Sequence, residues 1–291
     1  MSIVRDVTDE EIDLYATHGW VLLRQWLDPA AVALALSAAR AVMGVAADIP
    51  TSSIFSADVA MWQRWDEPWR RRPELACLGR SDEFTRPLAD LAGRPEGIRY
   101  LNDQLTAKVP RAAGNTDTPW HQDNPYLAID REGDLTVWVA LHDMRPEHGT
   151  VRFLPGSHAV GPLEESLLLG SDLRAAHPEL WSRYGVSGPL TLQAGDATVH
   201  HGNTIHGAPA NSTRGPRWAY ICEYIPGDAL VDRLPNKRAE AAGLRQGDMF
   251  PDDRYPRTLP RHDRSRDPRR GTAAAVTLGG HGPDRPATRR R

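Results

Sequence analysis

Cysteine is scarce in this chain of 291 residues, which contains only Cys77 and Cys222. Two cysteines are too few for a disulfide framework, so a reducing cytoplasm is the expected compartment. Long apolar runs are also missing, because no stretch approaches the roughly 20 residues that a membrane-spanning helix needs. The first residues are acidic, with Asp6 and Asp9 among them, where a signal peptide would carry a basic segment before an apolar run. We therefore expect a cytoplasmic protein without a membrane span.

Bulk composition is ordinary for a globular protein, with 40% hydrophobic and 25% charged residues. The length permits one sizeable core, and all-β barrels of this size are commonly single domains. We predict one domain over residues 1–251, which consists of a helical front (residues 1–98) and a strand-rich core (residues 99–226) with a closing segment.

Charge is unevenly distributed along the chain. Residues 252–291 contain 11 Arg and 5 Asp, and neither Lys nor Glu, which gives them a net charge of +6; since the whole chain carries −3, residues 1–251 carry −9. This end also lacks apolar periodicity, so we expect a flexible basic tail. A nucleic-acid-binding arm is the alternative, and it is disfavoured because no aromatic residue follows Tyr255 to stack on bases.

Local signals predict two helices and a strand near the start of the chain. Thr8, with Glu11 three residues later, forms a capping box for a helix that stops at Gly19. Residues 20–24 are apolar and are expected to form a strand. A proline at the first helical position then begins an alanine-rich helix over residues 29–43.

The remainder is dominated by strands and turns from residue 99 onward, whereas residues 48–69 are typical of a loop. A helical front followed by many short strands predicts a mainly β protein with flanking helices. Its core is expected to be a double-stranded β-helix, the jelly roll of cupins, with roughly eight strands. Three tryptophans recur at helical spacing, which is more typical of an apolar helix stripe than of a substrate pocket: Trp62, Trp65 and Trp69.

The segment Trp120-His121-Gln122-Asp123 carries the strongest chemical signal. Side chains two residues apart in an extended strand point to the same face, so His121 and Asp123 can converge on one metal ion. His206, much further along the chain, can supply a third ligand. Two histidines and one carboxylate form the facial triad of non-haem iron oxygenases, which leaves other coordination positions open. Each residue alone is a weak signal, since the chain has 11 His and 38 Asp and Glu.

The residues around this motif occur in an informative order. The triplet is followed in turn by an apolar strand with Trp138, by Leu154-Pro155-Gly156-Ser157-His158, by Gly195-Asp196, by Ile205-His206-Gly207-Ala208 and by Arg217. The run from about Trp120 to Tyr224 resembles the phytanoyl-CoA dioxygenase family of Fe(II)/2-oxoglutarate oxygenases. Residues 8–44 and 243–248 resemble the opening and closing segments of that family, so the resemblance covers most of the first 250 residues.

The resemblance implies that His121, Asp123 and His206 bind Fe(II), to which 2-oxoglutarate and O₂ then bind. It also implies that Arg217, eleven residues after His206, binds the distal carboxylate of 2-oxoglutarate, since a guanidinium pairs with carboxylates bidentately. Arg217 opens a strand that we expect to pair beside the strand of His206. Arg214 lies in a polar turn and is expected at the surface.

Two further histidines compete with His206 for the third ligand position. His200 and His201 precede it, but only His206 has the following glycine of the family and the arginine eleven residues later. We therefore assign neither of them as a ligand. His201 is expected beside the ligands, where hydrogen bonds orient them.

The strand expected over residues 100–108 carries two further candidates. Gln104 and Lys108 share one face of it by the period of two. In members of the family such as ectoine hydroxylases, the corresponding positions face the substrate and 2-oxoglutarate. Trp138 matches a position where the family has an aromatic residue that forms a wall beside the cosubstrate. The alternative is that Trp138 only packs in the core.

The carboxylate of Asp123 bears on the type of reaction. Related halogenases have a small residue there, which opens a site for chloride. A carboxylate therefore favours hydroxylation, or another two-electron oxidation such as desaturation, of a small molecule such as a secondary metabolite, with release of succinate and CO₂. The chain shows no acyl-CoA-binding signature.

Two functions of other classes stay open at this point. One is a catalytically silent, cupin-like binding module, against which the intact set of site residues argues. The other is a zinc-dependent hydrolase or isomerase. Arg217 and the lack of a general base beside the triad argue against that second alternative.

Overall fold

The computed structural model describes residues 3–51, 63–163, 173–232 and 237–261. The strands within these ranges are β1 (Trp20–Leu23), β2 (Gln63–Asp66), β3 (Ile98–Lys108), β4 (Thr118–His121), β5 (Leu135–Ala140), β6 (Arg152–Phe153), β7 (Ala197–His201), β8 (His206–Ala208), β9 (Arg217–Pro226) and β10 (Arg257–Thr258). The α-helices are α1 (Asp9–His18), α2 (Pro29–Met43), α3 (Asp82–Ala92), α4 (Leu173–Ala176), α5 (Pro178–Tyr184) and α6 (Lys237–Ala241).

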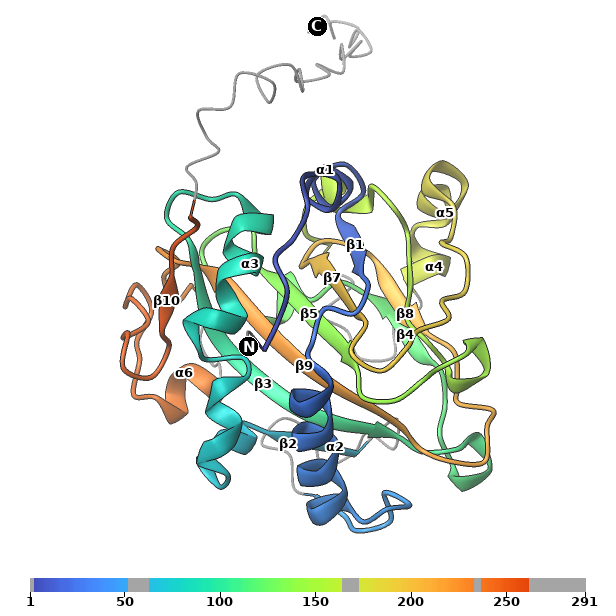
Figure 1. Ribbon diagram of the computed structural model, residues 1–291. Helices are drawn as coiled ribbons and strands as arrows, with labels where there is room; N and C mark the ends of the chain where they lie inside the picture. Colours follow the sequence, from blue (N-terminus) through green and yellow to red (C-terminus); the bar gives the residue numbers. More distant parts are fainter. Residues whose placement is uncertain (1–2, 52–62, 164–172, 233–236, 262–291) are drawn as a thin grey trace, which may run out of the picture.

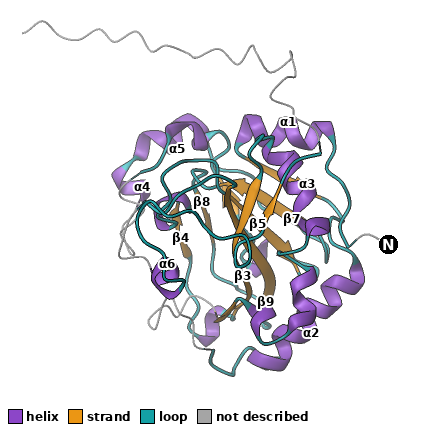
Figure 2. Cartoon of the chain, turned by 90° about the vertical axis from the view of Figure 1, so that its left-hand side faces the viewer, coloured by secondary structure: helices purple, strands orange, loops and turns teal. Residues whose placement is uncertain are grey.

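The strands form two antiparallel sheets. The larger sheet has the order β1-β7-β5-β9-β3-β10, with β2 also paired to β3, and the smaller sheet has the order β4-β8-β6. Figure 1 shows the large sheet with α1, α2 and α3 lying over it. Figure 2, turned by 90°, shows these helices on one side of the large sheet and β4, β8 and α4 on the other. This is the predicted mainly β, jelly-roll architecture with flanking helices.

The first two helices begin where the local signals predict. The Thr8 hydroxyl accepts a hydrogen bond from the Glu11 N–H, and the Glu11 carboxylate accepts one from the Thr8 N–H at 2.8 Å. Gly19 ends α1 with a φ of 71°, a conformation that glycine adopts without strain. Asp28 caps α2, and Pro29 occupies its first turn.

The main core lies between the large sheet and the three N-terminal helices. Trp218 and Tyr220 of β9 point outward there and pack with Ile12 of α1, Ala35 of α2 and Phe84 of α3. Since successive side chains of a strand point to opposite faces, the residues between these on β9 face the small sheet.

A second, smaller core fills part of the space between the two sheets. It contains Trp138 of β5, Phe153 of β6 and Ala219 of β9. The Trp20 ring stacks on Phe153 with 4.4 Å between ring centroids. The candidate functional residues also lie in this space, on the inner faces of the sheets.

Residues 63–66 form a strand, so the prediction of a loop over residues 48–69 is wrong there. β2 pairs with β3 along its whole length. Its hydrogen-bond partners on β3 lie about 40 residues later in the chain. No local sequence pattern could therefore predict this strand. Trp65 therefore lies on a strand and Trp69 in a 3₁₀ turn, so these two do not form a helical stripe. Trp62 lies outside the described residues.

Residues 252–261 pack into the domain, so the boundary predicted at residue 251 is too early. β10 pairs with β3, and Tyr255 is buried. The guanidinium of Arg99, buried in β3, donates to the Tyr255 carbonyl at 2.7 Å. Arg261 donates to the Asp90 carboxylate at 2.8 Å. These contacts are made by a two-residue strand and by single side chains. Neither leaves a pattern in the sequence, and the basic composition of this end therefore led to the prediction of a tail.

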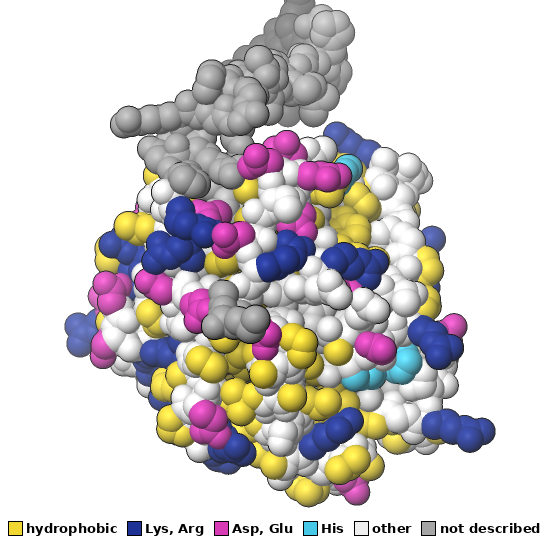
Figure 3. Space-filling model, viewed as in Figure 1, with side chains coloured by type: hydrophobic (Ala, Val, Ile, Leu, Met, Phe, Trp, Pro, Cys, Tyr) yellow, Lys and Arg dark blue, Asp and Glu magenta, His cyan; other side chains and the backbone are white. Residues whose placement is uncertain are grey.

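The surface over α2 is rich in small apolar side chains. Figure 3, in the view of Figure 1, shows hydrophobic side chains gathered on this lower part of the face. Val45 and Ile49, just after α2, are 72% and 51% exposed. No helix among the described residues is both long enough and apolar enough to cross a membrane.

Candidate active site

His121 and His206 face each other across the small sheet. β4 ends at His121 and β8 begins at His206, and the two residues are paired in register. Nδ1 of His121 lies 2.8 Å from the Pro119 carbonyl, and Nδ1 of His206 lies 3.0 Å from the Thr204 carbonyl. Because a carbonyl oxygen only accepts, each Nδ1 carries the proton. Nε2 of each ring is therefore free to offer its lone pair to a metal.

Asp123 reaches the same point by a route that differs from the prediction. Its φ of −83° and ψ of −39° are helical, so the extended strand expected through Asp123 already ends at His121. The chain turns there because the Asp123 N–H donates to the Gly202 carbonyl at 2.8 Å. Oδ1 of the carboxylate then lies 3.5 Å from His121 Nε2 and 3.6 Å from His206 Nε2.

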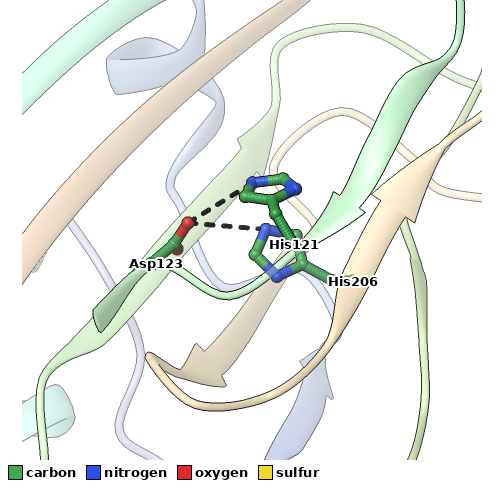
Figure 4. Close-up of side chains that lie close together, drawn as sticks. All are labelled: His121, Asp123 and His206. Carbon is green, nitrogen blue, oxygen red and sulfur yellow. Dashed lines mark ion pairs between the residues drawn. The ribbon is translucent and has the colours of Figure 1, made fainter. Parts of the chain in front are cut away.

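The three side chains could hold one metal ion. One ligand atom from each lies within 4.8 Å of the others, and Figure 4 shows the three groups pointing toward one another. Burial, with His121 and His200 nearby, lowers the pKa of His206 well below its usual value, so its imidazole is neutral, as metal binding requires. Two neutral imidazoles and one carboxylate are the donor set of non-haem Fe(II) sites, so the residues fit iron.

His200 supports Asp123, a role that the sequence did not indicate. His200 Nε2 lies 3.0 Å from Asp123 Oδ2, and the Thr136 hydroxyl donates to the same oxygen at 2.6 Å. Burial opposes ionisation of Asp123, but the surrounding histidines, His206 above all, outweigh it and hold the pKa of the carboxyl well below its usual range. The carboxylate is therefore ionised and oriented, with Oδ1 turned toward the ligand histidines.

His201 does not take the supporting position expected for it. Its Nδ1 accepts from the Asn203 N–H at 3.0 Å, and its ring lies 5.7 Å from that of His158. The alternation of β7 turns His200, and not His201, toward the metal ligands. The pairing of His200 with Thr136 across β7 and β5 is the signal that would have found it, and that signal depends on strand register.

Lys108 and Arg217 lie together at the other end of the inner face. They are paired in register on β3 and β9, and their side chains are buried. Arg217 donates to the Gly149 carbonyl at 2.5 Å and lies over the Trp138 ring, 5.2 Å from its centroid. The Lys108 ammonium donates to the Thr118 hydroxyl at 2.9 Å.

These two buried cations lack an anionic partner among the described residues, and Arg217 Nε has no hydrogen-bond partner there. Burial, and then repulsion from Arg217, lowers the pKa of Lys108 to about 7, while Asp117 acts in the opposite direction. Burial lowers the pKa of Arg217 to about 10. A carboxylate placed beside the pair would raise both pKa values and favour both charges, so the residues fit the distal end of 2-oxoglutarate.

The strand of Arg217 does not pair beside the strand of His206, contrary to expectation. β9 lies in the large sheet between β5 and β3, whereas β8 lies in the small sheet. Arg217 therefore approaches the space between the sheets from the side opposite His206. Arg214, in the turn before β9, is exposed as predicted.

Gln104 and Trp138 also lie on the inner face of the large sheet. Each is paired in register with Ile221 of β9, from opposite sides, so the three form one row across the sheet. Gln104 lies on β3 four residues before Lys108, and the period of two places both on the inner face, as predicted. Trp138 belongs to the small inner core and also contacts the guanidinium of Arg217.

Known proteins that resemble this chain share the chemistry that the metal-binding triad and the buried cations indicate. Residues 15–219 match the phytanoyl-CoA dioxygenase (PhyH) family. The chain belongs to this family. A Stutzerimonas stutzeri protein named "Probable alpha-ketoglutarate-dependent hypophosphite dioxygenase" is 24% identical over 226 residues, which are 74% of this chain and 77% of that protein. Phytanoyl-CoA dioxygenase 1 of Oryza sativa subsp. japonica is 33% identical over 123 residues, 40% of this chain and 44% of the rice protein, so the match spans less than half of that relative.

Solved structures similar to this PhyH-family chain are 2-oxoglutarate-dependent enzymes. The carbocyclase SnoK from nogalamycin biosynthesis has a TM-score of 0.71 and 23% identity, and the match covers 87% of this chain and 97% of SnoK. The epimerase SnoN, in complex with Fe³⁺, alpha ketoglutarate and nogalamycin RO, has a TM-score of 0.67 and 25% identity over 85% of this chain and 96% of SnoN. The chain is therefore an iron- and 2-oxoglutarate-dependent oxygenase of the PhyH family.

Proposed function

We propose that this PhyH-family oxygenase hydroxylates an unactivated C–H bond of a small-molecule metabolite, with release of succinate and CO₂. His121, Asp123 and His206 are the ligands of Fe(II) in this proposal. The observation that carries it is the position of Asp123 Oδ1, 3.5 Å and 3.6 Å from the two Nε2 atoms. With a carboxylate in this position, the site has no vacancy for a halide, which favours hydroxylation over halogenation.

The protein's own contribution is orientation. Bound iron and 2-oxoglutarate supply the oxidising chemistry, and the surrounding residues position the groups that react. Thr136 and His200 hold Oδ2 of Asp123, so the carboxylate offers one oxygen to the metal and leaves coordination positions open. The hydrogen bonds of the two ligand histidines to backbone carbonyls fix their rings in the same way.

In this proposal the protein holds the cosubstrate, 2-oxoglutarate, by its distal carboxylate. Arg217 and Lys108 bind the distal carboxylate of 2-oxoglutarate, and Trp138 forms the wall along its length. Gln104, four residues from Lys108 on β3 and nearer the metal, faces the substrate. The two cations are already buried and already in place, so little reorganisation accompanies binding of the carboxylate.

The test is iron-dependent succinate formation from 2-oxoglutarate by the purified chain. We expect one Fe(II) per chain, and loss of both metal and uncoupled turnover in His121→Ala and in His206→Ala. His201→Ala is the matched control, because this histidine lies in the same region but turns away from the ligands. Metal loss in His201→Ala but not in His206→Ala would overturn the ligand assignment. A chain that binds iron but never consumes 2-oxoglutarate would be a binding module instead.

Product analysis tests hydroxylation separately from oxygenase activity. With ¹⁸O₂, a hydroxylated product carries one labelled oxygen, and succinate carries the other. The similar structures include a carbocyclase and an epimerase, whose names denote outcomes without a new hydroxyl group. A product without ¹⁸O, formed together with labelled succinate, would reject hydroxylation and leave the oxygenase assignment intact.

A further inference from the structure

Several buried polar atoms on the inner face of the large sheet have no hydrogen-bond partner among the described residues. They are Arg217 Nε, His200 Nδ1, Thr198 Oγ1, Asn102 Nδ2 and Gln104 Oε1. Buried polar atoms are nearly always hydrogen-bonded, so such a group on one face indicates ligands between the sheets. Arg217 lies at the proposed cosubstrate site, and His200 lies beside the proposed metal ligand Asp123. Asn102 and Gln104, both on β3, are not explained by either.

A β-bulge turns Asn102 toward the metal side of the sheet. Tyr100 is paired with Tyr224, and both pack in the outer core, whereas Asn102 is paired with Glu223 after a shift in register. In a regular strand without a bulge, Asn102 would share the outward face of Tyr100, two residues earlier. Bulges commonly re-aim side chains beside active sites. Gln104, two residues further along β3, then lies on the same inner face as Asn102.

The two amides lie close to the proposed iron ligands. Glu223 is paired with Asn102 on one side and with Thr136 on the other, and Thr136 donates to Asp123. Neighbouring strands lie about 4.8 Å apart, so Asn102 is about 10 Å from Thr136 across the sheet. A bound molecule of modest size can therefore touch the amides while one of its carbon atoms lies beside the metal.

The strand beside the amides is partly exposed, although the two amide atoms themselves are buried. β9 is an interior strand whose outer face is covered by helices, and all its residues are buried except Ile221 and Glu223. Both of these residues point inward by the alternation of the strand. Their exposed surface therefore borders the space between the two sheets. Glu223 lies beside Asn102 there, and Ile221 lies beside Gln104.

We infer that Asn102 and Gln104 form a substrate subsite that binds neighbouring hydroxyl groups of a neutral polyol, such as a sugar ring or another polyhydroxylated ring. This inference rests on the proposed function and specifies its substrate class. Asn102 Nδ2 offers a donor and Gln104 Oε1 an acceptor, about 7 Å apart along the strand. A hydroxyl group can satisfy either one, and Ile221 supplies an apolar surface for the carbon face of the ring.

Other substrate chemistries fit this surface less well. An acyl chain would cover both amides and leave a buried donor and a buried acceptor unsatisfied, which is costly. An anionic group would lie next to the Glu223 carboxylate. On the other side of Gln104, Asp66 of β2 is already ion-paired with Arg64. The surface therefore favours a neutral group with several hydroxyls.

The test uses the full chain loaded with Mn(II) and 2-oxoglutarate, in which the paramagnetic ion relaxes the protons of nearby molecules. Methyl α-D-glucopyranoside is the polyol probe and hexanoyl-CoA is the acyl probe. We expect enhanced proton relaxation of the glucoside with the native chain and a several-fold loss in Asn102→Leu and in Gln104→Leu. Gln63→Leu is the matched control, because Gln63 pairs with Ala107, whose side chain lies in the outer core. It should leave the enhancement unchanged.

The outcomes separate this inference from the proposed function. A chain that does not bind Mn(II) or 2-oxoglutarate, seen from water relaxation, would refute the oxygenase site itself. Normal loading without any relaxation of the glucoside, or with equal relaxation in the two leucine variants, would overturn only the polyol subsite. Relaxation of hexanoyl-CoA in preference to the glucoside would also overturn it. Melting temperatures of the variants show whether each one is folded before binding is compared.

Discussion

Lys108 and Arg217 lie opposite each other on β3 and β9, and both side chains are buried. Two buried cations side by side disfavour each other's charge, and among the described residues neither one has an acidic partner. The arrangement is therefore unfavourable in the empty protein and favourable once a carboxylate binds beside it. It supports a ligand-binding role for the pair over a structural one.

Replacing Arg217 tests this role directly. Arg217→Ala should weaken 2-oxoglutarate binding by about 2–5 kcal/mol, the cost of removing one partner from a buried, hydrogen-bonded charge pair. Metal content should stay nearly unchanged, because Arg217 makes no contact with the triad. The measurement is the 2-oxoglutarate dependence of succinate formation. Arg214→Ala is the control, since Arg214 is exposed. Normal affinity in Arg217→Ala, or loss of affinity in Arg214→Ala, would show that the assignment is wrong.

The binding of 2-oxoglutarate should depend on pH through Lys108. Burial and Arg217 lower the pKa of Lys108 to about 7 in the empty protein, with Asp117 opposing them. A bound carboxylate favours the charged ammonium and raises this pKa, so binding above pH 7 takes up a proton. The dissociation constant should therefore rise with pH above that value, by up to about tenfold per pH unit. Below it the constant should be flat.

Lys108→Met separates this effect from other titrations. The variant should bind 2-oxoglutarate more weakly at low pH and should lose the rise above neutral pH. Titrations of the Mn(II)-loaded protein on both sides of pH 7 would measure both properties. If the native chain and Lys108→Met showed the same pH profile, the titrating group would have to be another residue.

Much of this site follows from the sequence because its chemistry is carried by residue type and spacing. The His-x-Asp triplet, the distal histidine and the arginine eleven residues later led to the family that the comparison establishes. The capping box at Thr8 and the proline at the start of α2 predicted the first two helices, since those signals are local. The triplet and the capping signals depend on residues that are close together in the chain, and His206 was assigned through the resemblance to the family.

The features that the sequence did not reveal depend on register between distant strands. His200 supports Asp123 because β7 pairs with β5, and Asn102 faces inward because of a bulge opposite β9. β2 forms only because β3 lies beside it. A one-residue change in register exchanges the two faces of a strand, so no local pattern could have decided these positions.

The contacts of Asp123 Oδ2 should control metal affinity. His200→Phe and Thr136→Val each remove one donor to this oxygen while keeping the approximate shape of the side chain. Losing such an outer partner typically costs about 10–100-fold in metal affinity or activity. Thr198→Val is the matched control, because Thr198 is buried on the same face and its hydroxyl has no described partner. Equal Fe(II) affinities in all three variants would mean that the metal itself orients Asp123.

The C-terminal end of the described chain should contribute to stability up to Arg261. Thr258 of β10 is buried, and its hydroxyl donates to the Asp82 carboxylate at 2.9 Å. Arg261 donates to Asp6 at 2.6 Å and to Asp90 at 2.8 Å. Truncation after Pro256 removes the strand and these ion pairs, and it should lower the melting temperature by several degrees.

Truncation after Arg261 should leave melting temperature and succinate formation unchanged, because residues 262–291 lack the apolar periodicity that would add to a core. The ion pairs of Arg261 are partly exposed, so Arg261→Ala alone should cost at most about 1 kcal/mol. In a domain of this size that is a shift of about 2–4 °C. A large stability loss on removing only residues 262–291 would show that the basic end docks. Loss of turnover with unchanged melting temperature would instead place that end at the active site.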